Sequence, residues 1–316
     1  MISRRNIRVK VMQTLYTVSS LENDVKPREP RLILKGHFKQ TRSLLIYLTW
    51  FLTEVSRYAE TDSHQRASKH LPSREDLNVN TKIAGNELIW KMLDDQALRE
   101  QFAEEKPELV FQQSKEETRD LIRKIYQLLT GSPEYAAYIA VPGRDRSGEK
   151  GILEFILNDL LLANDTFISH LEENFTNWDD DGELVVQLLA GYIQKPGSIQ
   201  FKQLLSPDKE QFAFSLLDTV IEKDEHLQSL IIPKLKNWDP ERIALLDMIL
   251  MKMGVAEFLY FETIPPKVTI NEYIDLAKEY STAQSGQFVN GILDNIHKEL
   301  VQQGKMLKVD YKKGTS

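Results

Sequence analysis

The sequence of 316 residues contains no cysteine. This absence excludes disulfides, thiolate zinc sites and cysteine nucleophiles, and it suits a reducing cytoplasm. The N-terminal residues also lack a continuous apolar run before a small-residue cleavage site, so they do not resemble a secretory signal. We therefore expect a cytoplasmic protein.

A long apolar run free of charge is also missing. The longest apolar stretch, residues 243–261, is nearly long enough to span a bilayer, but Asp247, Lys252 and Glu257 interrupt it. At 100° per residue, these three charges are scattered around a helix and share no shielded face. We predict the central helix of a bundle at this position and no membrane contact.

Motifs that carry catalysis are absent as well. The six histidines show no metal-ligand spacing, and neither HExxH nor GxSxG occurs. Residues 143–150, GRDRSGEK, have the glycine spacing of a phosphate-binding loop, but Glu149 replaces its lysine and no apolar strand precedes it. We interpret this segment as a surface linker.

One dense carboxylate cluster, Asp179 to Asp181, is present. Such a run can hold magnesium for prenyl diphosphate chemistry, but that chemistry needs a second acidic cluster, and none is evident. Gly182 and the helix macrodipole favour a capping turn at this position. The sequence thus predicts no enzyme, no metal and no cofactor.

Apolar residues recur with a helical period along the chain, and no alternating strand pattern is convincing. We expect strong helices at about 4–20 and 40–59, a polar loop at 61–80, and shorter helices within 83–106 and 115–129. The fold class predicted is all-α.

A short motif occurs twice. Asn177-Trp178-Asp179 recurs 60 residues later as Asn237-Trp238-Asp239, with similar apolar positions around both copies. Duplication of a helical hairpin explains this match, and chance similarity between amphipathic helices remains the alternative.

The C-terminal segment shows several helix boundaries. Ser206-Pro207 predicts one helix start, Asp239-Pro240 the start of the central apolar helix, and Thr269 with Glu272 a capping box. Gly291 lies inside the last predicted helix, where glycine costs about 1 kcal/mol relative to alanine. We interpret it as a point of close helix approach.

The motifs at both ends of the chain resemble those of the NusB family. IPPKVTINEYIDLAKEYS and QFVNGILDNI are similar to the paired-helix signature that closes NusB proteins, and MKMGVAEFL is similar to the helix before it. SRRNIRVKVMQTLYT resembles the arginine-rich first helix of the family. The similarity covers the first twenty residues and about the last hundred, and an insertion separates them.

This resemblance implies a NusB-like helical bundle with an enlarged helical N-terminal region. We expect a helical N-terminal region at 1–200, a NusB-like domain at 206–300 and a flexible basic tail at 301–316. The resemblance also implies transcription antitermination: binding of boxA-type single-stranded RNA from ribosomal RNA transcripts together with the ribosomal protein NusE, within the RNA polymerase antitermination complex.

The net charge of −7 opposes nucleic-acid binding at long range, but four cations fall within the first ten residues and no acid precedes Glu22. By motif position the resemblance places a partner contact at Asp247, for which an ordinary solvent-facing charge is the alternative. A core position is the alternative for Phe288. The expected RNA-binding residues are Arg4, Arg5, Arg8, Lys10, Gln13, Tyr16, Lys252, Gln287 and Phe288.

The chain departs from the family pattern at Asn6, Lys252, Pro266 and Gln287, and each change weakens charge or stacking on the expected RNA face. Two interpretations follow. The insertion supplies replacement cations, with Arg42, Arg57, Arg66 and Lys69 as candidates, or the protein is an interaction scaffold that has lost RNA binding. An RNA methyltransferase would need a downstream α/β domain, which we do not expect.

Overall fold

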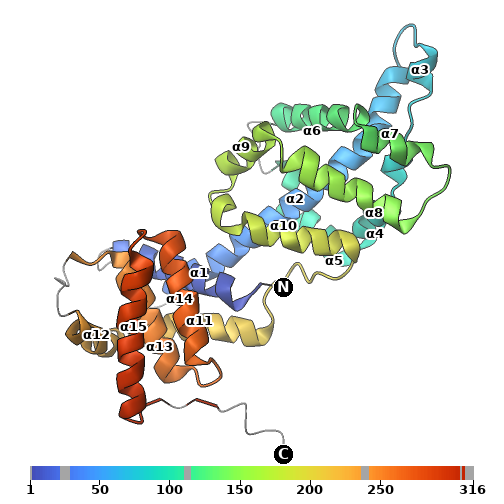
Figure 1. Ribbon diagram of the computed structural model, residues 1–316. Coiled ribbons are helices and arrows are strands. Elements are labelled where there is room, and N and C mark those ends of the chain that lie inside the picture. The colour runs from blue at the N-terminus through green and yellow to red at the C-terminus, as the bar shows by residue number, and fades with distance from the viewer. Residues whose placement is uncertain (1, 22–28, 110–114, 236–241, 307, 310–316) are drawn as a thin grey trace, which may run out of the picture. The chain divides into compact units, whose positions relative to one another are not determined.

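The computed structural model describes residues 2–21, 29–109, 115–235, 242–306 and 308–309. Over these residues the protein consists of helices, turns and loops, with no strand (Figure 1). The all-α prediction is therefore confirmed. No helix in the described part of the chain is long and apolar enough to cross a membrane.

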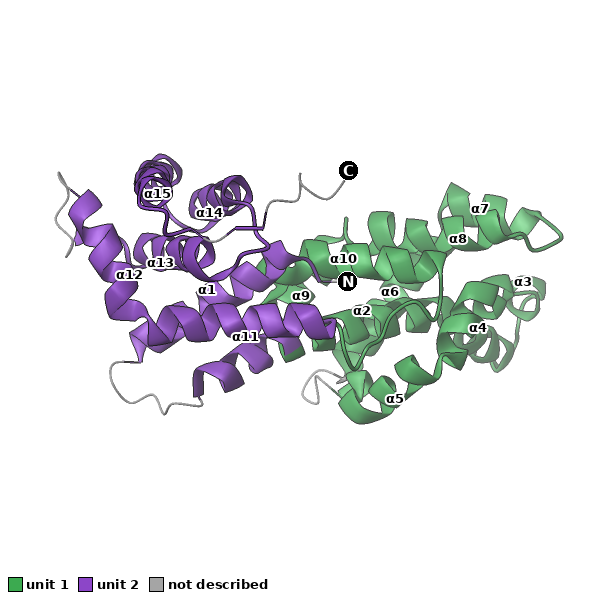
Figure 2. Cartoon of the chain, turned by 90° about the horizontal axis from the view of Figure 1, so that it is seen from below, with its two compact units in different colours: residues 1, 39–204 green, residues 2–38, 205–316 purple. Residues whose placement is uncertain are grey.

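The chain forms two compact units (Figure 2). Unit 1 contains residues 39–204, and unit 2 contains residues 2–38 together with 205–316. The helix α2, Glu29–Ala67, belongs to unit 2 over residues 29–38 and to unit 1 beyond them. This division differs from the one expected from sequence, because the first helix groups with the C-terminal helices and not with residues up to 200.

Unit 2 is built around one apolar helix, α13, Leu245–Tyr260, which packs against five other helices of the unit. This arrangement agrees with the central helix expected at 243–261. Its predicted start at Asp239-Pro240 lies outside the described residues. The helices around α13 are α1 (Arg4–Ser20), α11 (Pro207–Glu222), α12 (Asp224–Ile231), α14 (Pro266–Tyr280) and α15 (Ser285–Gln302).

Unit 1 has a separate core, to which α2, α4 to α10 and the segments between them contribute. Its helix α2 extends well beyond the predicted 40–59, because Pro30 occupies the first turn, where no backbone donor is needed, and because part of the expected loop at 61–80 is helical. The remaining helices are α3 (Arg74–Leu77), α4 (Glu87–Asp94), α5 (Gln96–Glu105), α6 (Lys115–Thr130), α7 (Pro133–Ala140), α8 (Arg146–Phe155), α9 (Asp165–Asn174) and α10 (Trp178–Gln194).

The repeated motif is only partly visible. Its first copy lies at the start of α10, where Asn177 is the N-cap residue. Its second copy, at 237–239, lies outside the described residues.

Gly254 marks the close helix approach in unit 2. A Cβ atom there would lie 2.9 Å from Cδ2 of Leu293 and 3.3 Å from Cδ2 of Tyr273, and both side chains are fully buried. At Gly291 a Cβ atom would meet nothing within 4 Å. Close approach therefore explains Gly254, and the interpretation of Gly291 was wrong.

These two glycines give a matched pair of substitutions. We expect Gly254→Ala to destabilise the protein, since overpacking costs about 1–3 kcal/mol and exceeds the helix propensity gained. Gly291→Ala should stabilise it by up to about 1 kcal/mol, because only the propensity changes. Denaturant unfolding followed by circular dichroism measures both, and equal effects of the two substitutions would contradict the packing described.

Candidate functional site

A buried carboxylate organises the centre of unit 2. Glu257 of α13 is 0% exposed, and its two oxygens accept four hydrogen bonds from three side chains. Arg8 of α1 donates from Nε to Oε1 at 2.7 Å and from Nη2 to Oε2 at 3.1 Å. The hydroxyls of Thr269 and Tyr273, both on α14, donate to Oε2 and Oε1, each at 2.9 Å.

Arg8 is held on every side. Its third nitrogen, Nη1, donates to Glu272 at 3.2 Å, and its guanidinium lies 5.7 Å from the ring centroid of Phe212. Burial alone would lower the pKa of Arg8, but the hydrogen bonds and negative charge of Glu257, with Tyr273 and Glu272, raise it above its ordinary value. The Arg8 side chain is 2% exposed and cannot contact RNA directly. The prediction of an RNA contact at Arg8 is therefore corrected: the residue has a structural role.

The same contacts change the interpretation of Thr269 and Glu272. The helix α14 begins at Pro266 with Pro265 as its N-cap residue, so these two residues lie inside the helix and form no capping box. Burial, followed by the charge of Glu257, raises the pKa of Tyr273 well above its ordinary value. Its hydroxyl therefore stays protonated and donates a hydrogen bond to Glu257. Spacing alone cannot distinguish a capping box from two side chains of one helix that bond to residues of other helices.

The first turn of α1 presents two accessible arginines. Arg4 is exposed, with its guanidinium 5.5 Å from the ring centroid of Phe212, and Arg5 forms an ion pair of 2.7 Å with Glu279. Ser3 is the N-cap residue, and the side chain of Asn6 accepts from its backbone N at 3.2 Å. Asn6 therefore completes a capping box, which gives a physical reason for its departure from the arginine of the family pattern.

The rest of α1 divides between core and surface. Lys10 is buried, at 2% exposure, so the prediction of an RNA contact there is also corrected: the residue lies in the interior of unit 2. Gln13 is half-buried, and Tyr16 is 48% exposed. The accessible candidates on this helix are thus Arg4, Arg5, Gln13 and Tyr16.

The candidates on α13 and α15 divide in the same way. Gln287 is exposed and Phe288 is half-buried, whereas the Lys252 side chain is 14% exposed and forms an ion pair with Asp224. Asp247 is 6% exposed and accepts from Ser285 Oγ at 2.8 Å, at the start of α15. Asp247 is therefore neither a solvent-facing charge nor an exposed residue that a partner could contact directly.

The helices that carry these residues meet on α13. The main contacts of α1 are with α11 and α13, and those of α15 are with α13 and α14. The sequence interpretation required α1, which carries Arg4, to pack beside α15, which carries Phe288, to form a complete RNA surface. This pair of helices is not among the main contacts. Both helices nevertheless belong to unit 2.

The candidate cations of the insertion are all paired in unit 1. Arg42 pairs with Glu105, Arg57 with Glu54, Arg66 with Asp62, and Lys69 with Asp76. The structure therefore does not support the interpretation that these four residues replace the RNA contacts of the family. The acidic excess of the chain also lies in unit 1, whereas positive and negative residues nearly balance in unit 2.

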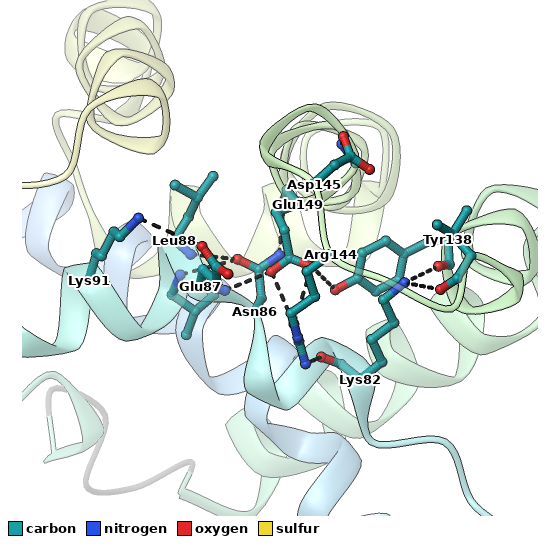
Figure 3. Close-up of polar contacts among 12 residues, drawn as sticks. Lys82, Asn86, Glu87, Leu88, Lys91, Tyr138, Arg144, Asp145 and Glu149 are labelled. Atoms are coloured by element: carbon teal, nitrogen blue, oxygen red, sulfur yellow. Dashed lines mark hydrogen bonds and ion pairs between the residues drawn. The ribbon is translucent and has the colours of Figure 1, made fainter.

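The segment GRDRSGEK is not a linker. Glu149 is 1% exposed and accepts from Tyr138 Oη at 2.7 Å, from Arg144 Nη1 at 3.1 Å and from the backbone N of Glu87 at 2.6 Å (Figure 3). Asp145 is the N-cap residue of α8 and accepts from Gly148 N at 2.9 Å. Glu149 thus connects α8 to two neighbouring helices of unit 1 through the hydrogen bonds that it accepts from Tyr138 of α7 and from the backbone at the start of α4. Its ion pair with Arg144 lies within the segment.

The aspartate cluster also has a structural role. Asp181 is 1% exposed and accepts from Thr41 Oγ1 at 2.8 Å and Asn177 Nδ2 at 2.6 Å, while Asp179 is exposed in the first turn of α10. Among the residues that the structure describes, no group of three or more acidic or histidine side chains could hold a metal ion.

Comparison with known proteins finds one matching family. The model of the NusB family matches residues 174–298, a stretch that begins upstream of Ser206 and includes α10. Three proteins named transcription antitermination protein NusB are similar to this chain. That of Chloroherpeton thalassium is 40% identical over 134 residues, 40% of this chain and 64% of the relative.

The other two relatives show comparable identity. The protein of Salinibacter ruber is 40% identical over 102 residues, 32% of this chain and 64% of the relative. That of Desulfatibacillum aliphaticivorans is 39% identical over 110 residues, 34% of this chain and 77% of the relative. The matched part of this chain thus spans somewhat less than two thirds of the first two relatives.

A solved structure titled T. maritima NusB is also similar in sequence, at 30% identity over 39% of this chain and 80% of that one. Its TM-score is 0.30. The sequence matches, and not this superposition, carry the family assignment.

The buried network predicts a large difference between neighbouring arginines. Arg8→Ala leaves the Glu257 carboxylate buried without its cation, and we expect a loss of about 3–5 kcal/mol in the free energy of unfolding. Arg4→Ala removes an exposed side chain and should change that free energy by less than about 0.5 kcal/mol. Urea unfolding of the two variants tests this, and a small effect of Arg8→Ala would show that the network is not formed.

Proposed function

The chain belongs to the NusB family, and on that premise we propose that it is a transcription antitermination factor that binds boxA-type single-stranded RNA together with NusE. The three relatives carry the name of that activity. In this proposal the protein acts in the cytoplasm by binding, as part of the RNA polymerase antitermination complex, and performs no catalysis.

The observation that carries the proposal is the pair of accessible arginines at the start of α1. Arg4 and Arg5 lie in the first turn of a capped helix, and Arg8, one turn further on, anchors that helix to α13 and α14. Guanidinium groups suit phosphate oxygens because they donate two parallel hydrogen bonds and keep their charge. A helix fixed in this way presents both groups with little loss of backbone freedom.

The charge distribution is compatible with RNA at this position. Repulsion of phosphate by the net charge of −7 originates mainly from unit 1, because unit 2 is nearly balanced. The Arg5 ion pair with Glu279 is half-exposed, so separating it to bind a phosphate costs little.

Stacking groups support a single-stranded ligand. Tyr16, exposed on α1, and Phe288, half-buried on α15, are the two aromatic rings that we assign to unpaired bases. Gln13 and Gln287 supply polar contacts in the proposed surface. Lys252 contributes only after its ion pair with Asp224 separates, so we assign it a minor role.

The proposed NusE contact is placed at the start of α13. Because Asp247 is buried and accepts from Ser285, it holds α15 in place and does not meet a partner directly. Leu245, two residues earlier, is 42% exposed and is the apolar side chain that a bound protein would cover.

The burial of Arg8 and Lys10 favours a second candidate. With two of the expected cations in the interior, a scaffold that keeps the NusB fold and binds proteins without RNA is the alternative function. The two functions differ in one measurable property, since only the antitermination factor binds boxA RNA with a salt dependence that Arg4 and Arg5 determine.

Filter binding of boxA RNA in the presence of NusE, repeated over a range of salt concentrations, separates them. We expect each of Arg4→Ala and Arg5→Ala to weaken binding and to reduce the slope of log K against log salt by about 0.7, the value for one phosphate contact on a single strand. Arg57→Ala, a half-exposed arginine of unit 1, is the matched control and should leave both quantities unchanged. Absence of RNA affinity in the unaltered protein would favour the scaffold.

A further inference from the structure

Unit 1 contains a cavity of about 370 Å³ between α7 and α8. Each helix lines the cavity with one face. The lining residues are Glu134, Ala137 and Tyr138 of α7 with its C-cap residue Val141, and Gly148, Glu149, Gly151, Ile152 and Phe155 of α8. Small residues leave space between these faces: Ala137 on α7, and Gly148 and Gly151 on α8. A Cβ atom at Gly151 would meet nothing within 4 Å, so the cavity has room at this point for a larger side chain.

The wall of the cavity is mainly apolar. Val141, Ile152 and Phe155 line it together with Tyr138, and Val141 is 49% exposed. The volume lies near the lower end of the range for small-molecule sites, which start at about 300 Å³. It suits one large side chain better than a nucleotide cofactor.

The charged groups around the cavity leave an excess of negative charge. Glu134 and Asp145 are both exposed, and neither forms an ion pair with a cation in the described part of the chain. Lys82 directs its Nζ to the carbonyl oxygens of Tyr138 and Val141, each at 2.7 Å (Figure 3). The charge of Arg144 is balanced by buried Glu149.

We propose that this cavity binds one large apolar side chain of a protein partner, with lysine or arginine beside it in the partner sequence. The cavity receives the apolar group, and Glu134 and Asp145 attract the neighbouring cations. The acidic excess of unit 1 favours the approach of a basic protein and opposes that of a nucleic acid. This site is separate from the RNA surface proposed on unit 2, and neither proposal depends on the other.

The test uses the full chain and three fluorescein-labelled peptides, GKKWKKG, GKKAKKG and GEEWEEG, measured by fluorescence anisotropy. We expect saturable binding of GKKWKKG alone, weakened by added salt because the cations contribute. Gly151→Leu fills the cavity and should weaken this binding by at least about tenfold, as expected for loss of a central anchor. Glu134→Lys should also weaken it, because repulsion replaces attraction at the rim.

Gly191→Leu is the matched control. Gly191 is likewise an exposed helical glycine whose Cβ would meet nothing within 4 Å, and it is not among the residues that line the cavity. Both leucine variants should unfold at or above the temperature of the unaltered protein, because leucine is the better helix former.

Three results would overturn the proposal: no saturable binding of GKKWKKG, equal binding of GEEWEEG, or equal affinity of the Gly151→Leu and Gly191→Leu variants. Binding of an oligouridine that Gly151→Leu abolishes, without peptide binding, would identify a nucleobase site in its place.

Discussion

The need to neutralise a buried carboxylate governs the construction of unit 2. Glu257 lies in the most apolar helix of the unit, where an unpaired charge would be strongly destabilising. Its cation, Arg8, is 249 residues away in the sequence. The pair therefore joins the first helix of the chain to α13, while Glu272, Thr269 and Tyr273 extend the same network into α14.

This constraint also divides the cations of α1 between two roles. Arg8 faces the interior and holds the helix, and the arginines of the first turn remain accessible. Unit 1 can enlarge the chain without disturbing this arrangement, because residues 39–204 form a core of their own. The acidic excess of unit 1 explains how a negatively charged protein can retain a locally cationic helix end in unit 2.

The helical fold class and the family resemblance were accessible from sequence, because periodicity and local motifs carry them. The burial of Arg8, Lys10 and Asp247 was not accessible, since a charged residue on a helix gives no sign of which other helix will cover it. Thr269 and Glu272 were wrongly predicted to form a capping box, because the spacing of a capping box also places two side chains on one helix face, where they can bond to other helices. Neither could sequence distinguish Gly291 from Gly254, because close packing depends on the neighbouring helix.

The most direct test of this account is a double-mutant cycle between Arg8→Met and Glu257→Leu, measured by amide hydrogen exchange of α1 and α13. If the buried pair joins these helices, each single substitution lowers the opening free energy strongly, and the double substitution costs less than the sum by more than about 2 kcal/mol. Costs that add to within about 0.5 kcal/mol would contradict it, because the two residues would then stabilise the protein independently.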